Sequence, residues 1–562
     1  MVKRITAMVL TLVLVLGLAA CNTNPAPATT TASGSTTAAS GSTTAASGST
    51  TAAPSNTAEK KELVYGQVNM KAILDRTIIT YIETGQICEQ IFEGLLYNNP
   101  FTGEMQPCLA EGFATISADN LTYTFKLKQG VKWHDGTDFT ADDVLYTFER
   151  IFTPATGSLV VEDYQMIVGA QEMLDGTATT LSGIEVIDPY TIKVTITEPF
   201  ALFEPFFGTC PIYPRKGCTE AGADWGLGTA IGTGPFALQE HTMDIGARLV
   251  RNDNYHDQNR MPTIDSIYFK FYSDLNTMLL EYEAGNIDSL ILDGGMVEQY
   301  QDDPTFASHL NSHPTFGHYF LVMNFNMDPW KDNPKAREAF SYAVDTDSIC
   351  NDLFNGMYQP AAGLLTPSVM GHDSSLQPKK YDPEKAKALL AEAGYPGGVD
   401  IVMTTTSLES VGGKMIVAIQ ASAAAAGFNI SINEVDRAVW TDIRNNGKVE
   451  TFVASWFLGL SEADGIVYGF FHSGNNKFFS VMYVNEEYDN LVSQARSTLD
   501  VAARTELYRQ ADKHLLDNFV TVPVAWPVQF YLTQPWLQNF QTENYVPNFE
   551  HCDIDTALQP DR

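Results

Sequence analysis

The sequence lacks the short motifs that catalytic sites need. It contains no HExxH zinc motif, no GxSxG nucleophile elbow, no phosphate-binding loop and no GxGxxG fingerprint. Its 10 histidines are scattered, without the neighbouring ligands that a zinc site requires. We therefore expect a protein that is not an enzyme and that needs no metal and no cofactor.

Basic residues are scarce. The chain has 34 lysines and arginines against 67 aspartates and glutamates, a formal net charge of −33. A surface of this sign repels phosphate backbones and anionic lipid. We therefore expect no nucleic-acid partner, and contact with a membrane only through a lipid anchor. The net charge does not by itself predict a cationic ligand, because it says nothing about the lining of a cleft.

Cysteines are few, and none forms a CxxC pair. Two possibilities stay open for the six that follow Cys21. An even number in an exported chain permits disulfides, with Cys210 and Cys218 the closest in sequence, but spacing alone does not give the pairing. All six could equally be free thiols in the core. These cysteines are Cys88, Cys108, Cys210, Cys218, Cys350 and Cys552.

Long apolar runs are absent after the first residues. The run from Ile5 to Leu18 follows Lys3 and Arg4 and is shorter than the roughly 20 residues that span a bilayer. It predicts a signal peptide over residues 1–20.

The four residues from Leu18 to Cys21 resemble the lipobox of bacterial lipoproteins. That resemblance implies that Cys21 is acylated and holds the protein on the outer face of the cytoplasmic membrane, as in Gram-positive bacteria. The alternative is an ordinary signal peptide that is cut nearby and releases the protein.

Residues 21–58 contain mostly Ser, Thr, Ala, Gly and Pro. The segment Gly34–Ser40 recurs as Gly41–Ser47, and it has no large apolar residue with which to form a core. This composition predicts a flexible tether that follows the acylated cysteine.

The rest of the chain mixes strand and helix signals. Leu121–Lys128 alternates apolar and polar residues, as in a strand with one buried face. Thr140 and Asp143 have the spacing of a capping box. Asp382 precedes a proline and begins a second predicted helix, which Gly394 ends. These signals predict a mixed α/β protein.

Several blocks of sequence, in order, resemble one known family. They are similar to the signature regions of the bacterial extracellular solute-binding proteins that serve oligopeptide, dipeptide and nickel ABC importers. The blocks include Glu89–Ile151, Gly232–Phe236, Ala336–Asp347, Tyr381–Gly394 and Val522–Trp536.

The resemblance implies a two-lobed clamshell, with α/β lobes joined by two hinge strands and an extra inserted subdomain. The chain would cross between the lobes near Phe316 and near Trp536. The implied parts are lobe I (59–93, 215–316 and 536–562), the insert (94–214) and lobe II (317–535).

The implied function is capture of a small solute, most simply a peptide, by closure of the lobes over it. A monomer would then deliver the solute to the permease subunits of an ABC importer. Two alternatives remain: a non-peptide solute, such as an oligosaccharide, a modified amino compound or a metal chelate, and a surface receptor that senses a ligand.

The resemblance also implies a set of cleft residues. In peptide-binding relatives an aspartate three residues after a cleft tryptophan holds the peptide's ammonium group. Here Trp456 matches the tryptophan, but Gly459 takes the place of the aspartate, so Glu462 or Asp464 would have to replace it. Glu83 is the position expected to bind a cation or an amine. The implied ligand-binding residues are Tyr81, Ile82, Glu83, Trp440, Ser455, Trp456, Phe457 and Gly459.

Overall fold

The computed structural model describes residues 60–69, 73–79 and 81–560. The chain forms two units, residues 1–58 and 59–562, and every described helix and strand belongs to the second. The predicted signal peptide, Cys21 and the tether lie outside the described residues. Within the described part, no helix combines the length and the apolar character needed to cross a membrane.

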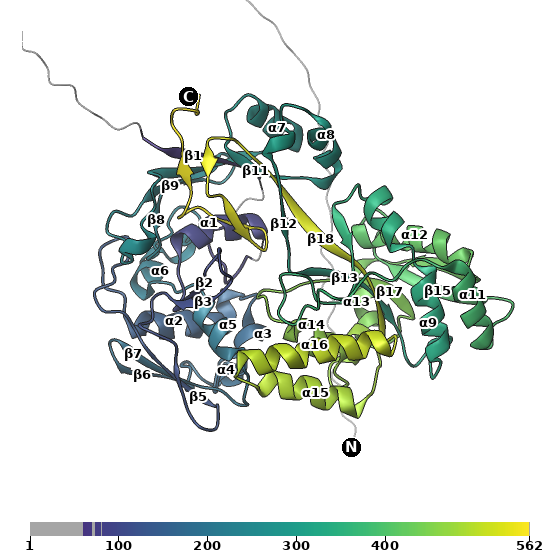
Figure 1. Ribbon diagram of the computed structural model, residues 1–562. Helices are drawn as coiled ribbons and strands as arrows, with labels where there is room; N and C mark the ends of the chain where they lie inside the picture. The colour runs from purple at the N-terminus through teal and green to yellow at the C-terminus, as the bar shows by residue number, and fades with distance from the viewer. Residues whose placement is uncertain (1–59, 70–72, 80, 561–562) are drawn as a thin grey trace, which may run out of the picture. The chain divides into compact units, whose positions relative to one another are not determined.

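One large sheet runs through this second unit (Figure 1). It has twelve strands, and its main path runs in the order β16-β15-β17-β13-β18-β11-β1-β10-β9-β8. The strand shared by both halves is β18 (Thr521–Thr533), which Figure 1 shows in yellow, passing from one lobe to the other. The predicted α/β fold with two lobes and two hinge strands is confirmed.

Two antiparallel segments form the hinge. The first half of β18 pairs with β13 (Gly317–Met323), and its second half pairs with β12 (Leu310–Pro314). The Thr315 hydroxyl, between β12 and β13, donates to the Pro527 carbonyl at 2.9 Å. On the lobe I side, β18 reaches β11 (Ser289–Leu292) at Phe530. The expected crossing near Trp536 lies several residues after the part of β18 where its pairing changes from β13 to β12. The residue limits of the lobes stay a prediction.

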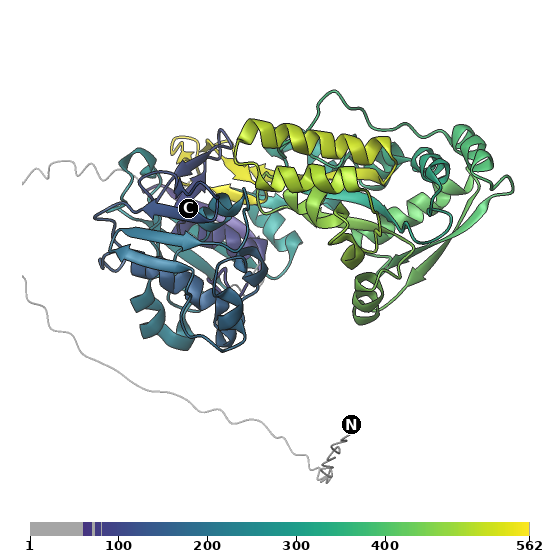
Figure 2. The same cartoon turned by 90° about the horizontal axis from the view of Figure 1, so that it is seen from below.

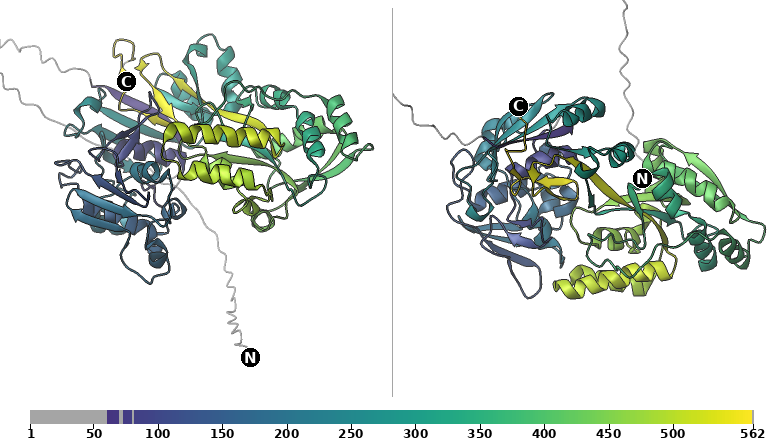
Figure 3. Two further views of the ribbon diagram at one scale, coloured as in Figure 1. Left: turned by 60° about the horizontal axis from the view of Figure 1, so that its bottom comes forward. Right: turned by 45° about the horizontal axis from the view of Figure 1, so that its top comes forward.

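Lobe I contains both the first and the last described strands of the chain. Leu63 and Tyr65 of β1 share a hydrophobic core with Trp536, Phe549 and Ile554. Figure 3 shows the yellow C-terminal segments beside the purple N-terminal strand. The elements of lobe I are β1 (Glu62–Val68), α1 (Ile82–Ile91), α6 (Arg215–Ala221), β8 (Phe236–Thr242), β9 (Gly246–Arg251), β10 (Ser266–Tyr272), α7 (Leu275–Glu283), β11, α8 (Val297–Asp302), β12, β19 (Leu537–Gln538), β20 (Gln541–Glu543), β21 (Val546–Asn548) and β22 (Asp553–Ile554).

The segment expected to form the insert has a sheet and a core of its own. The four strands of that sheet follow the order β4-β5-β7-β6, and the members of the core cluster run from Leu95 to Ile212. Its elements are β2 (Leu96–Asn98), β3 (Met105–Pro107), β4 (Thr115–Ile116), β5 (Thr122–Lys126), α2 (Ala141–Phe152), α3 (Val161–Tyr164), α4 (Ala170–Leu174), β6 (Ile184–Asp188), β7 (Thr191–Thr195) and α5 (Phe203–Thr209).

Lobe II places helices on both faces of its part of the sheet. Figure 2 shows α15 and α16 side by side along one face, and two separate core clusters lie on the two faces. Its elements are β13, α9 (Pro334–Ala343), α10 (Thr346–Ser348), β14 (Tyr358–Pro360), α11 (Pro383–Glu392), β15 (Val399–Thr405), α12 (Val411–Ala424), β16 (Phe428–Glu434), α13 (Arg437–Asn445), β17 (Thr451–Phe457), α14 (Asp464–Phe471), α15 (Glu486–Ser497), α16 (Val501–Asp517) and β18.

The local predictions from sequence are confirmed. The strand expected at Leu121–Lys128 is β5, which buries Tyr123 and Phe125. Thr140 and Asp143 form a capping box at the start of α2. The Asp382 side chain accepts from the Lys385 amide at the start of α11. The six described cysteines are buried free thiols, the second of the two possibilities.

Gly317 is required by close packing at the hinge. A Cβ atom at this position would lie 2.5 Å from the Phe457 ring and 2.6 Å from the Pro527 ring. Both rings belong to residues on the strands that flank β13, so a Cβ atom at position 317 would force at least one of them to shift. The hinge and the end of β17 are therefore mechanically coupled.

We predict that Gly317→Ala lowers the free energy of unfolding by about 1–3 kcal/mol, since overpacking a tight site costs that much. Urea unfolding measures it. Gly459→Ala is the control, because a Cβ there meets no atom within 4 Å. If Gly317→Ala and Gly459→Ala lowered the free energy of unfolding equally, the close packing of Gly317 between the flanking strands would be contradicted.

Candidate functional site

A cavity of about 500 Å³ lies between lobe I, the insert and lobe II. This volume falls within the range of about 300–1,000 Å³ that is typical of small-molecule sites. Four regions line it: α1 with the residues around it, the α3 and α5 side of the insert, the end of β17 in lobe II, and the β20–β21 hairpin.

The wall from lobe II is apolar. It consists of Phe316 and the four residues Phe457–Leu460. Phe457 is the last paired residue of β17, opposite Gly317, and its side chain is 44% exposed. Its ring lies 6.0 Å from that of Tyr545, across the cavity mouth. The position of Gly459 is open, since no atom lies within 4 Å of the place where a Cβ would be.

Three of the eight residues implied by the resemblance line the cavity: Ile82, Phe457 and Gly459. The acid that α1 contributes is Glu89, two turns after Ile82. Glu83 is not among the lining residues. Sequence reasoning missed Glu89, although it stands in the motif region that carried the resemblance.

The other implied residues lie elsewhere in the described structure. Trp440 is buried in the lobe II core, with its ring 5.0 Å from that of Phe452. Tyr81, Ser455 and Trp456 are exposed near the cavity without lining it. Trp456 is 38% exposed and contacts the ring of Phe470 edge-on at 5.2 Å. Their roles stay a prediction.

Neither candidate for the missing aspartate reaches the cavity. Glu462 forms a buried bidentate ion pair with Arg504, at 2.6 and 3.1 Å. Asp464 pairs with Arg496 at 2.7 Å, and burial raises the pKa of its carboxyl to about 6 against the attraction of that arginine. Both side chains are buried in lobe II, so Gly459 has no substitute there.

Glu93 anchors the lobe I wall through a dense hydrogen-bond network. Its carboxylate accepts from Tyr255 at 2.6 Å, Thr233 at 2.9 Å and Cys108 at 3.1 Å, and its Oε2 lies 2.8 Å from His256 Nε2. Burial opposes its ionisation, but His256, Arg260 and Tyr255 outweigh burial and lower the pKa of Glu93 to about 2.

Arg260 extends this network to the C-terminal segment. It donates to both Glu550 oxygens, at 2.7 and 2.9 Å, and lies 3.7 Å from Glu93. Its guanidinium stacks on the Tyr97 ring at 3.8 Å from the centroid. Arg260 therefore holds two carboxylates in place and has little capacity left for a solute.

Glu93, Cys108 and His256 also have the donor atoms of a metal site, within 4.8 Å of one another. The arrangement does not fit a cation. Both oxygens of Glu93 already have hydrogen-bond partners, burial raises the pKa of the Cys108 thiol well above its usual value, and the Arg260 guanidinium lies beside them. We interpret the cluster as a structural ion-pair network.

The β20–β21 hairpin is a part of the site that the sequence did not predict. Its tip residue Asn544 accepts from the Phe316 amide at 3.2 Å and donates to the Leu458 carbonyl at 2.9 Å. The Tyr545 carbonyl accepts from Gln86 of α1 at 2.8 Å. The hairpin thus links α1 with the lobe II wall. An Asn-Tyr pair at a turn gives no functional signal in the sequence.

The family model for the bacterial extracellular solute-binding proteins, family 5 Middle, matches residues 104–478. The chain belongs to family 5. The resemblance found in the sequence is confirmed. Proteins of this family are extracellular solute-binding proteins of ABC importers, which work with permease subunits and are not enzymes.

Curated relatives and solved structures agree with this family. The glutathione-binding protein GsiB of Salmonella paratyphi A is 30% identical over 434 residues, covering 74% of this chain and 80% of the relative. The murein tripeptide binding protein MppA, in an unliganded open form, superposes with a TM-score of 0.79 at 24% identity, covering 88% of this chain and 98% of MppA. DppA of Helicobacter pylori, in complex with the peptide STSA, gives 0.66 at 23% identity, covering 88% and 98%. These structures share the fold.

We predict that Glu93→Gln removes a pH-dependent part of the stability. Because the folded-state pKa of about 2 lies below the ordinary value of 4.5, ionised Glu93 contributes stability that is complete above about pH 4.5. That contribution, on the order of 3 kcal/mol, is lost as the pH falls toward 2. Urea unfolding from pH 7 to pH 2 should show the two proteins converging at low pH.

The matched control is Glu220→Gln, which removes an exposed carboxylate in α6 of the same lobe. Its pH profile should follow that of the unaltered protein. A constant difference between Glu93→Gln and the unaltered protein at all pH values would contradict the ion-pair network.

Proposed function

We propose that this protein is the substrate-binding lipoprotein of an ABC importer and captures a small, peptide-like solute by closing its lobes over it. One observation carries the proposal. The cavity takes its walls from both lobes, which are joined by the hinge strands and by a few further contacts, among them those of Asn544 and the hydrogen bond from the Ala201 amide to the Arg496 carbonyl. A solute that touches both walls favours the closed form, because it gains contacts that the open form lacks.

The names of several relatives and neighbours support a peptide-like solute. GsiB is named for glutathione, MppA for a murein tripeptide, and DppA was solved with a four-residue peptide. The exposed ring of Phe457 suits this class, since a flat ring contacts an extended chain without selecting one side chain.

The open position at Gly459 favours a second candidate. Lobe II offers no carboxylate for a peptide's ammonium group, and the residues that could replace it are already paired. A non-peptide solute, such as an oligosaccharide, a modified amino compound or a metal chelate, remains the alternative within the same binding class.

Solution scattering and calorimetry test the proposal together. Tripeptides of alanine, titrated into the purified chain, should bind one to one and reduce the radius of gyration as the lobes close. Binding without any change of radius would remove closure from the proposal, and turnover of the peptide would remove the binding function.

We predict that Phe457→Ala weakens tripeptide binding about tenfold or more, since truncating a central aromatic contact costs at least about 1.4 kcal/mol. Trp456→Ala should also weaken binding if closure brings that exposed ring onto the solute. Phe113→Ala is the control, because Phe113 is 54% exposed and does not line the cavity. Isothermal titration measures all three, and equal affinities would exclude these rings from the site.

We also propose that Cys21 is acylated, so that a monomer stays on the extracellular face of the cytoplasmic membrane, in a Gram-positive type of envelope. The support is the lipobox-like sequence and the low-complexity segment that follows it. Two signals are needed for stable anchoring of a protein to a bilayer by acyl chains, and a diacylglycerol supplies two chains.

We predict that Cys21→Ser moves the protein from the membrane fraction into the medium, measured by fractionation and by labelling with a radioactive fatty acid. Asn22→Ser, which keeps the sulfur, should behave as the unaltered protein does. Label on the Cys21→Ser variant would refute acylation at this residue.

A further inference from the structure

The charges around the cavity are unevenly distributed. Its lining includes four carboxylates, from Glu89, Glu93, Asp163 and Glu550, but only two guanidinium groups, from Arg76 and Arg260. All of them belong to lobe I or to the insert. The lobe II residues that line the cavity carry no charged side chain.

Two of the four carboxylates are already neutralised. Arg260 holds Glu550 in a bidentate pair, and together with His256 it lowers the pKa of Glu93 to about 2 despite burial. Both acids are buried. They belong to the wall itself, so Glu89 and Asp163 are the carboxylates left for a solute.

Glu89 forms no hydrogen bond or ion pair with any described residue. Its side chain is open to the cavity, yet the surrounding protein is dense enough that loss of hydration raises its pKa. Arg76 acts in the opposite direction but does not cancel this effect. A carboxylate that is partly dehydrated and has no bonded partner gains free energy when a cation approaches it.

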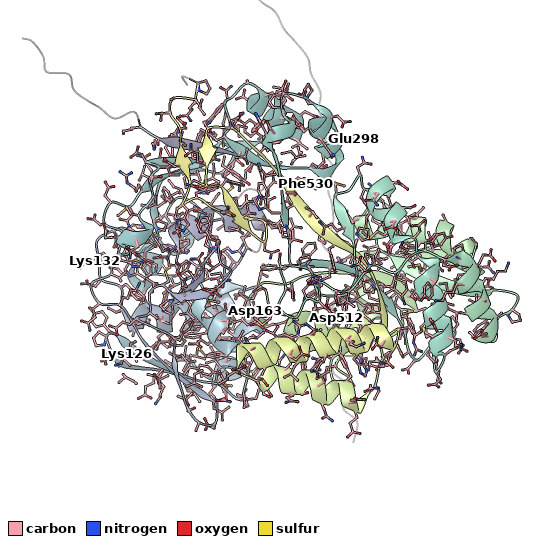
Figure 4. The ribbon with its side chains drawn as sticks, viewed as in Figure 1. Lys126, Lys132, Asp163, Glu298, Asp512 and Phe530 are labelled. Carbon is pink, nitrogen blue, oxygen red and sulfur yellow. The ribbon has the colours of Figure 1, made fainter. Side chains whose placement is uncertain are left out.

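Asp163, which the insert contributes to the cavity lining, is in the same situation. It belongs to α3 of the insert, and Figure 4 shows it on the side that faces lobe II. No described residue forms a hydrogen bond or an ion pair with it, and loss of hydration, together with the nearby Glu162, raises its pKa. Glu89 and Asp163 thus give the cavity two carboxylates that lack partners.

We propose that the cleft selects a cationic solute, whose ammonium or guanidinium groups bind to Glu89 of α1 and Asp163 of the insert. This inference rests on the proposed function. The anionic partner that lobe II lacks at Gly459 is supplied instead from the opposite walls. The solute is a basic peptide or a related amino compound.

Closure strengthens this selection. When the apolar wall at Phe457–Leu460 covers the solute, water leaves the cavity and each charge interaction becomes stronger. An anion in the same place meets two unpaired carboxylates, and that repulsion excludes it. Arg76, which has no ion pair among the described residues, can bind one carboxylate, so a solute with several carboxylates is a poor fit.

A panel of solutes that differ in charge tests the inference. It contains the tripeptides Ala-Lys-Ala, Ala-Ala-Ala and Ala-Glu-Ala, glutathione, and two compounds that are not peptides, spermidine and citrate. Isothermal titration at low salt should give at least about tenfold tighter binding of Ala-Lys-Ala than of Ala-Glu-Ala. Added salt should reduce that ratio only in part, because the charges lie inside a cleft.

Paired substitutions assign the preference to the two residues. The double variant Glu89→Gln with Asp163→Asn should reduce the ratio to less than about threefold. Neither side chain bonds to a described residue, so the amides leave the folded state intact. Glu220→Gln with Asp224→Asn is the control, because both of these acids are exposed in lobe I and do not line the cavity. It should keep the full ratio.

A gain of charge gives an independent test. Gly459→Asp adds a carboxylate in open space on the lobe II wall and should tighten the binding of Ala-Lys-Ala about threefold or more. Gly459→Asn adds nearly the same volume without the charge and should not.

The outcomes separate this inference from the proposed function. Tripeptides that bind without regard to charge would overturn the cationic solute and leave the importer function standing. Spermidine binding with no peptide binding would support the cationic solute and overturn the peptide-like one. Tighter binding of glutathione or citrate than of the cations, or no binding of any cation at millimolar concentration, would overturn the inference.

Discussion

The structure depends on the backbone pairing of one strand. β18 forms hydrogen bonds with β11 and β12 in lobe I and with β13 and β14 in lobe II. A sheet that continues from one lobe to the other fixes the register of the two walls. Beyond the hinge strands, the lobes are joined by the tip of the β20–β21 hairpin at Asn544 and by the hydrogen bond from the Ala201 amide to the Arg496 carbonyl.

The two walls of the cavity have different chemistry. Lobe I and the insert contribute all of its charged groups, and half of these are fixed by the Glu93 and Arg260 network. Lobe II contributes rings, aliphatic groups and the bare backbone at Gly459. Such a division suits a two-step capture, in which a solute first meets the charged wall and the apolar wall then excludes water.

Much of this architecture could be predicted from local sequence. Alternation at Leu121–Lys128, the cap at Thr140 and the Asp382-Pro383 start are short-range signals, and the structure confirms them. The solute-binding family could be recognised because several of its sequence motifs occur in this chain in the expected order. The site was less predictable, because Glu83 and Glu89 lie on one short helix, and only the folded structure shows that Glu89, and not Glu83, lines the cavity.

The sequence by itself determined the elements, the α/β class, the family and the absence of a carboxylate at position 459, since each depends on neighbouring residues or on motif order. Only the tertiary structure decided that Glu462 and Asp464 form ion pairs with Arg504 and Arg496. It also decided that Trp440 lies in the core and that Asn544 joins the lobe I and lobe II walls of the cavity. These facts depend on contacts between segments that lie dozens to hundreds of residues apart. Spacing along the chain does not encode such contacts; the packing of the cores and the pairing of the strands create them.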